Sequence, residues 1–381
     1  MKNLASVALA VLVGIAPRIA SAAGTISFGI TAPYTKVGGG AAPLWNPSQT
    51  HVAVSGNDVY VAYGETTAAG DDEVLVGHST DGGLTWDAGT VVAHGPGLVA
   101  TGAVAVAADP ATPGAIIVHV VYGAMTDAYG NGNIYYTHLR GGAWSTPVLV
   151  SYTSTAVADS GAVAASPSGH VSIVYAANSM IRRSESGDGG DNFYVQDGIV
   201  SGQSGSRPSV ALDAADDEFV AWADNTGIWF ARRNYRAFDF GAPVYAGNGY
   251  NGYNGISPLL VAQDASHLYI AYNWGMALGS YGIALSASTD GGASFTSHNV
   301  VPSQMGNVGL AVSSTGVLSL AYDGNGIVLQ RSTNGGSSWT SPVAVDAAVG
   351  SEYPSLALVA GKVVVAYDKK PGQAVYVTKE K

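Results

Sequence analysis

Carboxylates and a tyrosine stand next to the ends of several short apolar runs, where they could act on a sugar chain. Glu352 and Tyr353 precede the last apolar run, Asp224 follows an earlier one, and Asp159 precedes another. Acid and base chemistry on a glycosidic bond needs two carboxyl groups about 5 to 10 Å apart. We therefore take Glu352, Tyr353, Asp224 and Asp159 as candidate catalytic residues, although a sequence alone cannot give the distances between them.

A second set of side chains at equivalent positions is suited to holding a ligand. Carboxylates, amides and aromatic rings together match the hydroxyl groups and flat faces of sugars. A structural role is the alternative, because Asp and Asn after a strand form turns and the loop 248–254 can pack its own tyrosines. The candidate ligand-binding residues are Arg207, Trp274, Tyr250, Tyr253, Asp323, Asp368 and Trp45.

Several kinds of chemistry are excluded by what the chain lacks. There is no cysteine, so disulfides, thiolate zinc sites and cysteine nucleophiles are ruled out. The eight histidines are scattered without a close pair, and no phosphate-binding loop or nucleophile elbow occurs. We predict no cofactor and no metal-ligand set, and we leave a structural calcium ion open.

The charge balance limits the partners. The chain has 16 Lys and Arg against 27 Asp and Glu, a net charge of −11 over 381 residues. Such a surface disfavours nucleic acids and anionic membranes. Hydrophobic residues make up 47% of the chain, which is enough for a large buried core. We expect a monomer that binds a carbohydrate or another extracellular ligand, with neither a nucleic acid nor a membrane as partner.

The N-terminus has the layout of a secretory signal peptide. Lys2 is followed by an apolar run over 4–16 and then by the small residues 20–23. This run is shorter than the roughly twenty residues that a membrane span needs. We predict a signal peptide over 1–22, a single domain over 23–381, and a secreted or periplasmic protein.

A repeat organises the rest of the chain. Seven short apolar runs, about fifty residues apart, each end in an aromatic residue. Four strand-like runs separated by turns recur in each repeat without helical periodicity, which is typical of β-propeller blades. The last repeat has only three runs, and we expect residues 25–30 to supply its fourth strand and close the ring. The prediction is an all-β, seven-bladed β-propeller with four-stranded antiparallel blades, the last one completed by an N-terminal strand.

A repeated turn lies between the third and fourth runs. Its complete copies read STDGGLTW over 79–86, STDGGASF over 288–295 and STNGGSSW over 332–339, with looser copies over 186–193 and 140–144. The Asp or Asn side chain can accept backbone N–H groups across the turn, and two glycines supply positive φ. We expect the final aromatic residue to pack back between blades.

This turn resembles the Asp-box, or bacterial neuraminidase repeat, of the sialidase superfamily of propellers. In that superfamily the turns lie on the face away from the ligand, which implies a structural role for Asp81, Asp188, Asp290 and Asn334. Sialidases also hold the substrate carboxylate with three arginines, one within an Arg-Ile-Pro motif. The only Arg-Ile pair here begins at Arg18, inside the predicted signal peptide. The resemblance therefore implies a sialidase-like propeller without that arginine triad, and we do not expect sialidase activity.

Three functions are compatible with these observations. The leading hypothesis is a secreted Asp-box propeller that binds a glycan or another extracellular ligand on its channel face, the face around the mouth of the central channel, without converting that ligand chemically. A glycoside hydrolase or polysaccharide lyase of sialidase-like fold is the first alternative, and a protein-interaction scaffold is the second. The fold type cannot separate them, because propellers host many functions.

Overall fold

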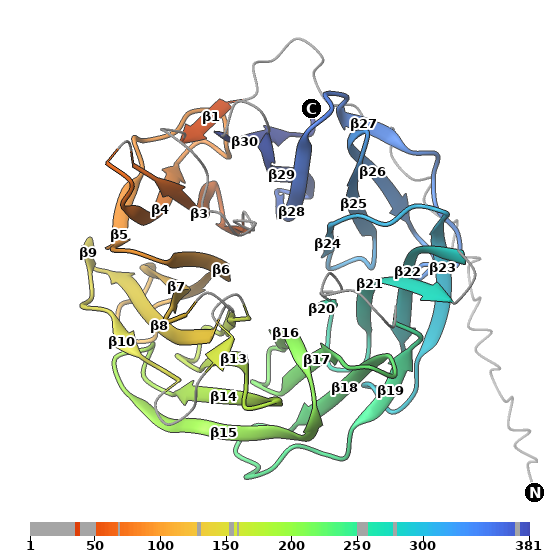
Figure 1. Cartoon of the computed structure of the whole chain (residues 1–381), viewed down its shortest axis with the longest axis horizontal. Coiled ribbons are helices and arrows are strands. Elements are labelled where there is room, and N and C mark those ends of the chain that lie inside the picture. Colours follow the sequence, from red (N-terminus) through yellow and green to blue (C-terminus); the bar gives the residue numbers. More distant parts are fainter. Residues whose placement is uncertain are drawn as a thin grey trace, which may run out of the picture.

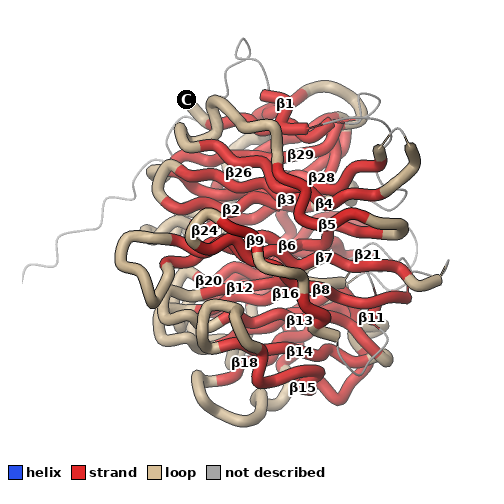
Figure 2. The backbone as a smooth tube through the Cα atoms, turned by 90° about the vertical axis from the view of Figure 1, so that its left-hand side faces the viewer, coloured by secondary structure: helices blue, strands red, loops and turns tan. Residues whose placement is uncertain are grey.

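The computed structural model is an all-β ring of sheets around a central opening (Figure 1). In the side view the described chain consists of strands and loops (Figure 2). The described residues form no helix that is long and apolar enough to cross a membrane. The predicted β-propeller is confirmed. The predicted signal peptide over 1–22 lies outside the described residues, and the single domain over 23–381 stays a prediction. The described residues are 35–38, 51–67, 69–127, 131–151, 156–157, 160–249, 258–276, 280–369 and 374–381.

Five sheets have four strands each, and in four of them every strand pairs with the next one along the sequence. All of these pairs are antiparallel. The first two of these sheets are β2 (His51–Ser55), β3 (Asp58–Thr66), β4 (Asp72–Ser79), β5 (Thr90–His94), and β16 (Ser206–Leu212), β17 (Glu218–Ala223), β18 (Ile228–Arg233), β19 (Val244–Gly247). The next two are β20 (Leu259–Ala262), β21 (Leu268–Met276), β22 (Ser280–Ser288), β23 (Thr296–Pro302), and β24 (Val308–Val312), β25 (Leu318–Gly324), β26 (Gly326–Ser332), β27 (Val343–Asp346).

The prediction of seven four-stranded blades is wrong, because the ring has five blades of four strands and one sheet of ten strands. Two of the predicted repeats are joined in this sheet, since Ala156 of β11 (Ala156–Val157) stands opposite Gly132 of β8 (Asn131–Arg140) and also opposite Ala177 of β13 (Val171–Ala177). Three short segments, β9 (Ala143–Trp144), β10 (Val148–Leu149) and β11, share the outer edge of β8 in place of one continuous fourth strand. The ten strands are β6 (Leu98–Ala108), β7 (Ile116–Met125), β8 (Asn131–Arg140), β9 (Ala143–Trp144), β10 (Val148–Leu149), β11 (Ala156–Val157), β12 (Ala162–Ala165), β13 (Val171–Ala177), β14 (Met180–Ser186) and β15 (Phe193–Ser204).

The fifth four-stranded sheet contains both ends of the described chain. It consists of β28 (Ser351–Val359), β29 (Lys362–Lys369), β30 (Ala374–Lys379) and β1 (Thr35–Gly38), and β1 pairs with β30 through Thr35 opposite Val377. This pairing agrees with the prediction that an N-terminal strand completes the last sheet. The predicted strand over 25–30 itself lies outside the described residues.

The innermost strands lie next to one another around the opening, and each sheet packs face to face on its neighbours. Strand β29 shows the consequence, because its side chains alternate between two hydrophobic clusters. Val364 and Ala366 join the cluster shared with the first sheet, whereas Val363, Val365 and Tyr367 join the cluster shared with β24–β27. A strand buried on both faces needs apolar residues at every position, which explains the continuous apolar runs of the sequence.

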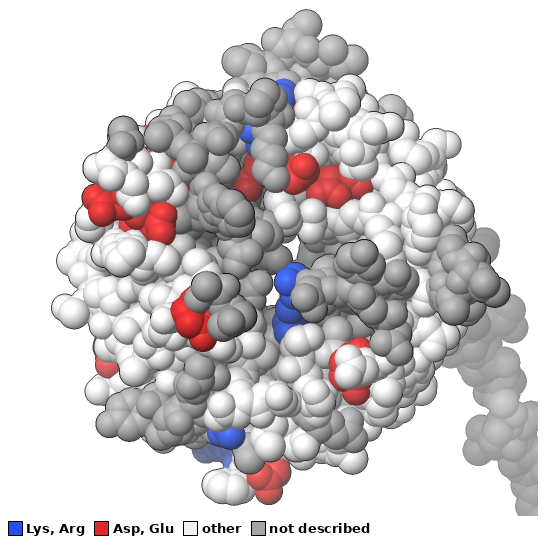
Figure 3. Space-filling model, viewed as in Figure 1, with Lys and Arg blue, Asp and Glu red and all other residues white. Residues whose placement is uncertain are grey.

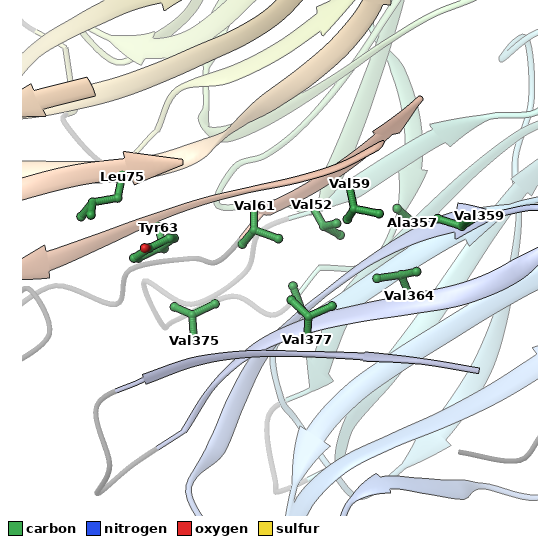
Figure 4. Packing of buried hydrophobic residues seen from close by; sticks show 11 residues of the cluster. Val52, Val59, Val61, Tyr63, Leu75, Ala357, Val359, Val364, Val375 and Val377 are labelled. Carbon is green, nitrogen blue, oxygen red and sulfur yellow. The ribbon is translucent and has the colours of Figure 1, made fainter. Parts of the chain in front are cut away.

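One hydrophobic cluster joins the first sheet to the last (Figure 4). Val61 and Tyr63 of β3 pack there with Val364 of β29 and Val377 of β30. All four side chains are at most 1% exposed. This cluster closes the ring, because it connects sheets that are separated by almost the whole length of the chain.

The repeated turns adopt one hydrogen-bonded geometry in four copies. In the copy between β22 and β23, the Ser288 hydroxyl donates to Asp290 Oδ1 (2.7 Å), and the Gly292 N–H donates to Ser288 Oγ (2.8 Å). The Ser294 N–H donates to Asp290 Oδ1 (3.0 Å), and the next residue, Phe295, packs edge-on against Phe230 of the neighbouring sheet. Equivalent contacts are made around Asp81, Asp188 and Asn334. The predicted turn chemistry is confirmed, while the Asp-box name stays a prediction.

We predict that Val377→Ala lowers the free energy of unfolding by roughly 2 kcal/mol, because it removes buried methyl groups and leaves a cavity in the closing cluster. Val91→Ala is the matched control, since Val91 on β5 is 45% exposed whereas Val377 is 1% exposed. Urea denaturation followed by fluorescence measures both. Equal midpoints for the two variants would show that the closing cluster does not carry this share of the stability.

The turn carboxylates should also make stability depend on pH. Hydrogen bonds from Ser294 and Ser288 lower the pKa of Asp290 to about 2. A depressed pKa in the folded state gives stability that is present above the unfolded value and is lost as the pH falls through the folded value. We predict that Asp290→Asn reduces the loss of stability between about pH 4 and pH 2, because an amide does not titrate in this range. The turn should still form, since Asn334 makes the equivalent hydrogen bond in another copy.

The reciprocal variant, Asn334→Asp, serves as the control and should steepen the same loss. Urea midpoints measured across this pH range test both variants. If neither variant changes the slope of the urea midpoint against pH, the pKa values of the turn carboxylates do not differ between the folded and the unfolded protein.

Candidate functional site

The candidate residues on the described strands lie at the ends opposite the repeated turns. In the sheet β24–β27, Ser332 begins a turn and stands opposite Leu318, whereas Asp323 stands opposite Ile327 near the other end of the same strands. The same relation holds in the first sheet, where Ser79 begins a turn opposite Val59 and Thr66 lies at the far end. We call the face at the Asp323 end the channel face.

Figure 3 shows how charge is distributed around the opening. Asp and Glu side chains form several patches around the ring, one of them over β25, β28 and β29, and Lys and Arg side chains lie beside the opening near β16. Asp323, Glu352 and Asp368, which the sequence analysis singled out, belong to these three strands. Glu352 on β28 and Asp368 on β29 are direct partners across the two strands.

Two innermost strands begin with the same backbone irregularity. The pairing register shifts between Ser206 and Ser209 in β16 and between Glu352 and Ser355 in β28. Within these bulges Arg207 has φ of 48° and Tyr353 has φ of 55°, and each is followed by a proline. Left-handed backbone at a residue other than glycine costs about 1–3 kcal/mol and gathers at functional sites. The two bulges therefore mark Arg207 and Tyr353 as candidate site residues.

Asp323 is buried, and its carboxyl group hydrogen bonds to two neighbouring segments of this region. Its Oδ1 accepts the Asn307 N–H (2.8 Å), and its Oδ2 accepts the Asn307 side-chain amide (2.7 Å) and the Tyr353 N–H (3.1 Å). Burial raises the pKa of Asp323, although these hydrogen bonds oppose the shift. The carboxyl group thus holds the start of β28 against β25, and it fixes the strained backbone at Tyr353.

Tyr353 is surrounded by three carboxyl groups. Burial raises the pKa of Tyr353 to about 12, and Glu352, Asp323 and Asp368 add to the shift while Arg207 opposes it. At neutral pH the phenol is therefore protonated, and it can donate a hydrogen bond. Glu352, Asp323, Asp368 and Arg207 thus all act electrostatically on Tyr353, and a binding or catalytic role for these residues stays a prediction.

A pair of hydrogen bonds extends this network to the next sheet. The Asn273 amide donates to Gly306 O (2.9 Å) and accepts the Gly306 N–H at 3.2 Å. Gly306 precedes Asn307, the residue that binds Asp323. Trp274, a predicted ligand-binding residue, follows Asn273 on β21 and lines a separate pocket beside β19.

The structure places the remaining candidates differently. Asp224 closes the turn between β17 and β18, where its Oδ1 accepts the Thr226 N–H (2.6 Å), the Thr226 hydroxyl (2.7 Å) and the Gly227 N–H (2.9 Å). These contacts give Asp224 a turn-forming role, and a catalytic role for it stays a prediction. Four further candidates lie outside the described residues: Asp159, Tyr250, Tyr253 and Trp45.

The sequence analysis missed a buried cluster of charges between β14 and β17–β18. Arg233 lies 2.8 Å from Glu185 and 2.9 Å from Glu218, and Arg183 contacts both glutamates. Burial alone would raise the pKa of Glu185, but the His170 ring and the two arginines hold it well below its usual range. The opposite charges balance, which indicates a structural cluster. Charged residues inside otherwise apolar strands were the signal that could have revealed it.

Within the described residues no group of three His, Cys, Asp or Glu side chains is arranged to hold a metal ion. The groups of the channel face described above that can react or bind are carboxylates, a phenol and a guanidinium. Such groups can exchange hydrogen bonds with sugar hydroxyls, and they can also transfer protons.

No protein-family profile matches the chain. No curated protein matches it in sequence either. Solved structures do match: an ulvan lyase of polysaccharide lyase family PL25 has a TM-score of 0.59 at 14% identity, covering 91% of this chain and 94% of the lyase.

Two sialidases match less closely. The Hadza microbial sialidase Hz136 has a TM-score of 0.51 at 12% identity and 87% coverage, and the chain spans 65% of its length. Trypanosoma rangeli sialidase has a TM-score of 0.51 at 11% identity and 87% coverage, and the chain spans 54% of its length. The chain thus has a sialidase-like β-propeller fold, and at these identities the likeness concerns the fold alone.

The backbone at Arg207 gives a test of the bulge. Arg207→Gly should be more stable than Arg207→Ala by about 1 kcal/mol, because glycine adopts positive φ without a steric cost. Both variants lose the guanidinium equally, so their difference reports the backbone. Urea denaturation measures it.

The matched control is the same pair of substitutions at Arg232, which lies inside β18. There alanine should be the more stable variant, because glycine weakens an ordinary strand. The same order at both positions would contradict a left-handed backbone at Arg207.

Proposed function

We propose that this protein is a secreted or periplasmic glycan-binding β-propeller whose channel face holds a sugar chain at Tyr353. The observation that carries the proposal is the strained Tyr353 among Glu352, Asp323 and Asp368, with Arg207 within electrostatic reach. The carboxylates accept hydrogen bonds from sugar hydroxyls, while the phenol and the guanidinium donate them. The tyrosine ring adds an apolar face for a pyranose.

The protonated state of Tyr353 suits binding. Its pKa is raised to about 12, so at neutral pH the phenol keeps its proton and can donate a hydrogen bond to a sugar oxygen. Asp323 already accepts three hydrogen bonds from Asn307 and Tyr353, which suits a positioning role. The side chains that we propose contact the ligand are Glu352, Asp368, Arg207 and the Tyr353 phenol.

One observation supports a second candidate function, a glycoside hydrolase or polysaccharide lyase. Glu352 and Asp368 face each other across β28 and β29. Directly paired residues of antiparallel strands have Cβ atoms about 4.5–5.5 Å apart. From Cβ atoms at this separation, the two side chains can bring their carboxyl groups to the roughly 5 to 10 Å that glycosidases use, with one group as acid and the other as base or nucleophile.

The test is calorimetric titration of the purified chain with neutral and uronate-containing hexasaccharides. We expect at least one of them to bind, and we expect Glu352→Gln and Tyr353→Phe each to weaken that binding by about tenfold, the effect of losing one hydrogen bond to a charged or buried group. Asp290→Asn is the matched control, because it changes a carboxylate to an amide in a repeated turn at the opposite end of the sheets.

Product analysis of the same mixtures separates the two candidates. Intact sugars after long incubation support binding alone. Shortened or unsaturated products that disappear in Glu352→Gln would replace the binding proposal with the enzyme. Absence of binding by every hexasaccharide, or full binding by Glu352→Gln, would reject the site at Tyr353.

A further inference from the structure

A pocket of about 380 Å³ lies between the sheets β16–β19 and β20–β23. This volume falls within the range of roughly 300–1,000 Å³ that is usual for small-molecule sites. Tyr245, Tyr272 and Trp274 contribute aromatic side chains to its lining, and Asn248, Ser297 and Asn299 contribute polar ones. The pocket is distinct from the group around Tyr353, with which it shares no lining residue.

One wall of the pocket carries an aromatic ring that is held in place and yet accessible. Tyr245 is 44% exposed, and its ring packs edge-on against Trp229 of the neighbouring strand, with centroids 5.4 Å apart. The Trp229 indole in turn donates to Thr226 Oγ1 at 3.1 Å. The Tyr245 hydroxyl donates to Asn248 Oδ1. A fixed, exposed ring loses little conformational entropy when a ligand stacks on it.

The pocket is also lined by the Trp274 indole on β21. Its partner across the strands is Gly282, where a Cβ atom would come within 2.7 Å of Trp274 Nε1. Glycine at this position therefore lets the indole lie against β22. The indole N–H is buried and has no hydrogen-bond partner within the described part of the chain.

The base of the pocket is rigid and joins the two sheets. The Tyr272 hydroxyl lies 3.1 Å from both Ser286 Oγ and Ser297 Oγ. Ser286 donates to Ala246 O of β19 at 2.6 Å, which fixes β19 against β22. The pocket is thus formed before any ligand arrives.

Among the residues that the structure describes, the lining contains no Asp, Glu, Lys or Arg. A carboxylate or sulfate group would enter such a pocket without a counter-charge, and its desolvation would be costly. An uncharged ligand with flat apolar faces and a hydroxyl rim fits the two rings and the surrounding amides and hydroxyls.

We propose that this pocket is a second sugar site, which binds one uncharged pyranose ring between Tyr245 and Trp274. The ligand class rests on the proposed glycan-binding function, but the residues are separate. Asn273 links the sites physically, because it precedes Trp274 and hydrogen bonds to Gly306, the neighbour of the residue that holds Asp323.

The experiment titrates xylohexaose, cellohexaose and hexagalacturonate into the full chain, with calorimetry and tryptophan fluorescence as readouts. A neutral hexaose should bind, and Tyr245→Ala and Trp274→Ala should each weaken it by about tenfold. Tyr245→Phe keeps the ring and should stay within about threefold of the original affinity. Phe238→Ala is the matched control, because Phe238 is 90% exposed and lies outside the pocket.

The outcomes separate this inference from the proposed function. If a neutral hexaose binds and Tyr245→Ala abolishes this binding, the result supports a sugar site in the pocket, whether or not Glu352→Gln also weakens the binding. If the binding survives Tyr245→Ala but is lost in Glu352→Gln, the sugar site in the pocket is overturned and only the site at Tyr353 remains. Absence of binding by both neutral hexaoses also overturns the pocket. Tyr245→Ala keeps the test valid if Trp274→Ala fails to fold, since the Tyr245 ring is largely outside the core.

Discussion

Both faces of the inner strands are buried against neighbouring sheets, so the ring is stable only if its first and last sheets also meet. The cluster around Val61, Val364 and Val377 makes that contact, and the pairing of β1 with β30 adds backbone hydrogen bonds at the edge of the last sheet. Closure also serves the candidate site. Glu352, Tyr353 and Asp368 belong to the sheet that closes the ring, so their positions depend on contacts between the two ends of the chain.

The channel face combines this closure with local strain. Bulges at Arg207 and Tyr353 hold both residues in a left-handed conformation at the start of innermost strands. At Tyr353, Asp323 offsets the cost of the left-handed backbone, because its buried carboxylate accepts the Tyr353 N–H together with two donors of Asn307. The surrounding packing and hydrogen bonds thus keep a site whose backbone would be unfavourable in isolation.

Carboxylates serve different purposes at different places in this ring. Glu185 and Glu218 are matched by Arg183 and Arg233, so their charges are neutralised inside the protein. The turn carboxylates, such as Asp290, bind nearby hydroxyl and backbone N–H groups. The carboxylates around Tyr353 outnumber the single guanidinium that acts on it, which suits a ligand rich in hydroxyl groups. The pocket at Tyr245 differs from this group, because its described lining carries no charged side chain.

The sequence by itself determined the all-β repeat and the hydrogen bonding of the turns, because these follow from local patterns. It could not decide the number of four-stranded sheets, since β11 pairs with two strands from different repeats. Nor could it separate the turn-forming Asp224 from the paired Glu352 and Asp368. Only the tertiary structure decided these points, because edge pairing, burial and the distance between side chains depend on residues far apart in the chain.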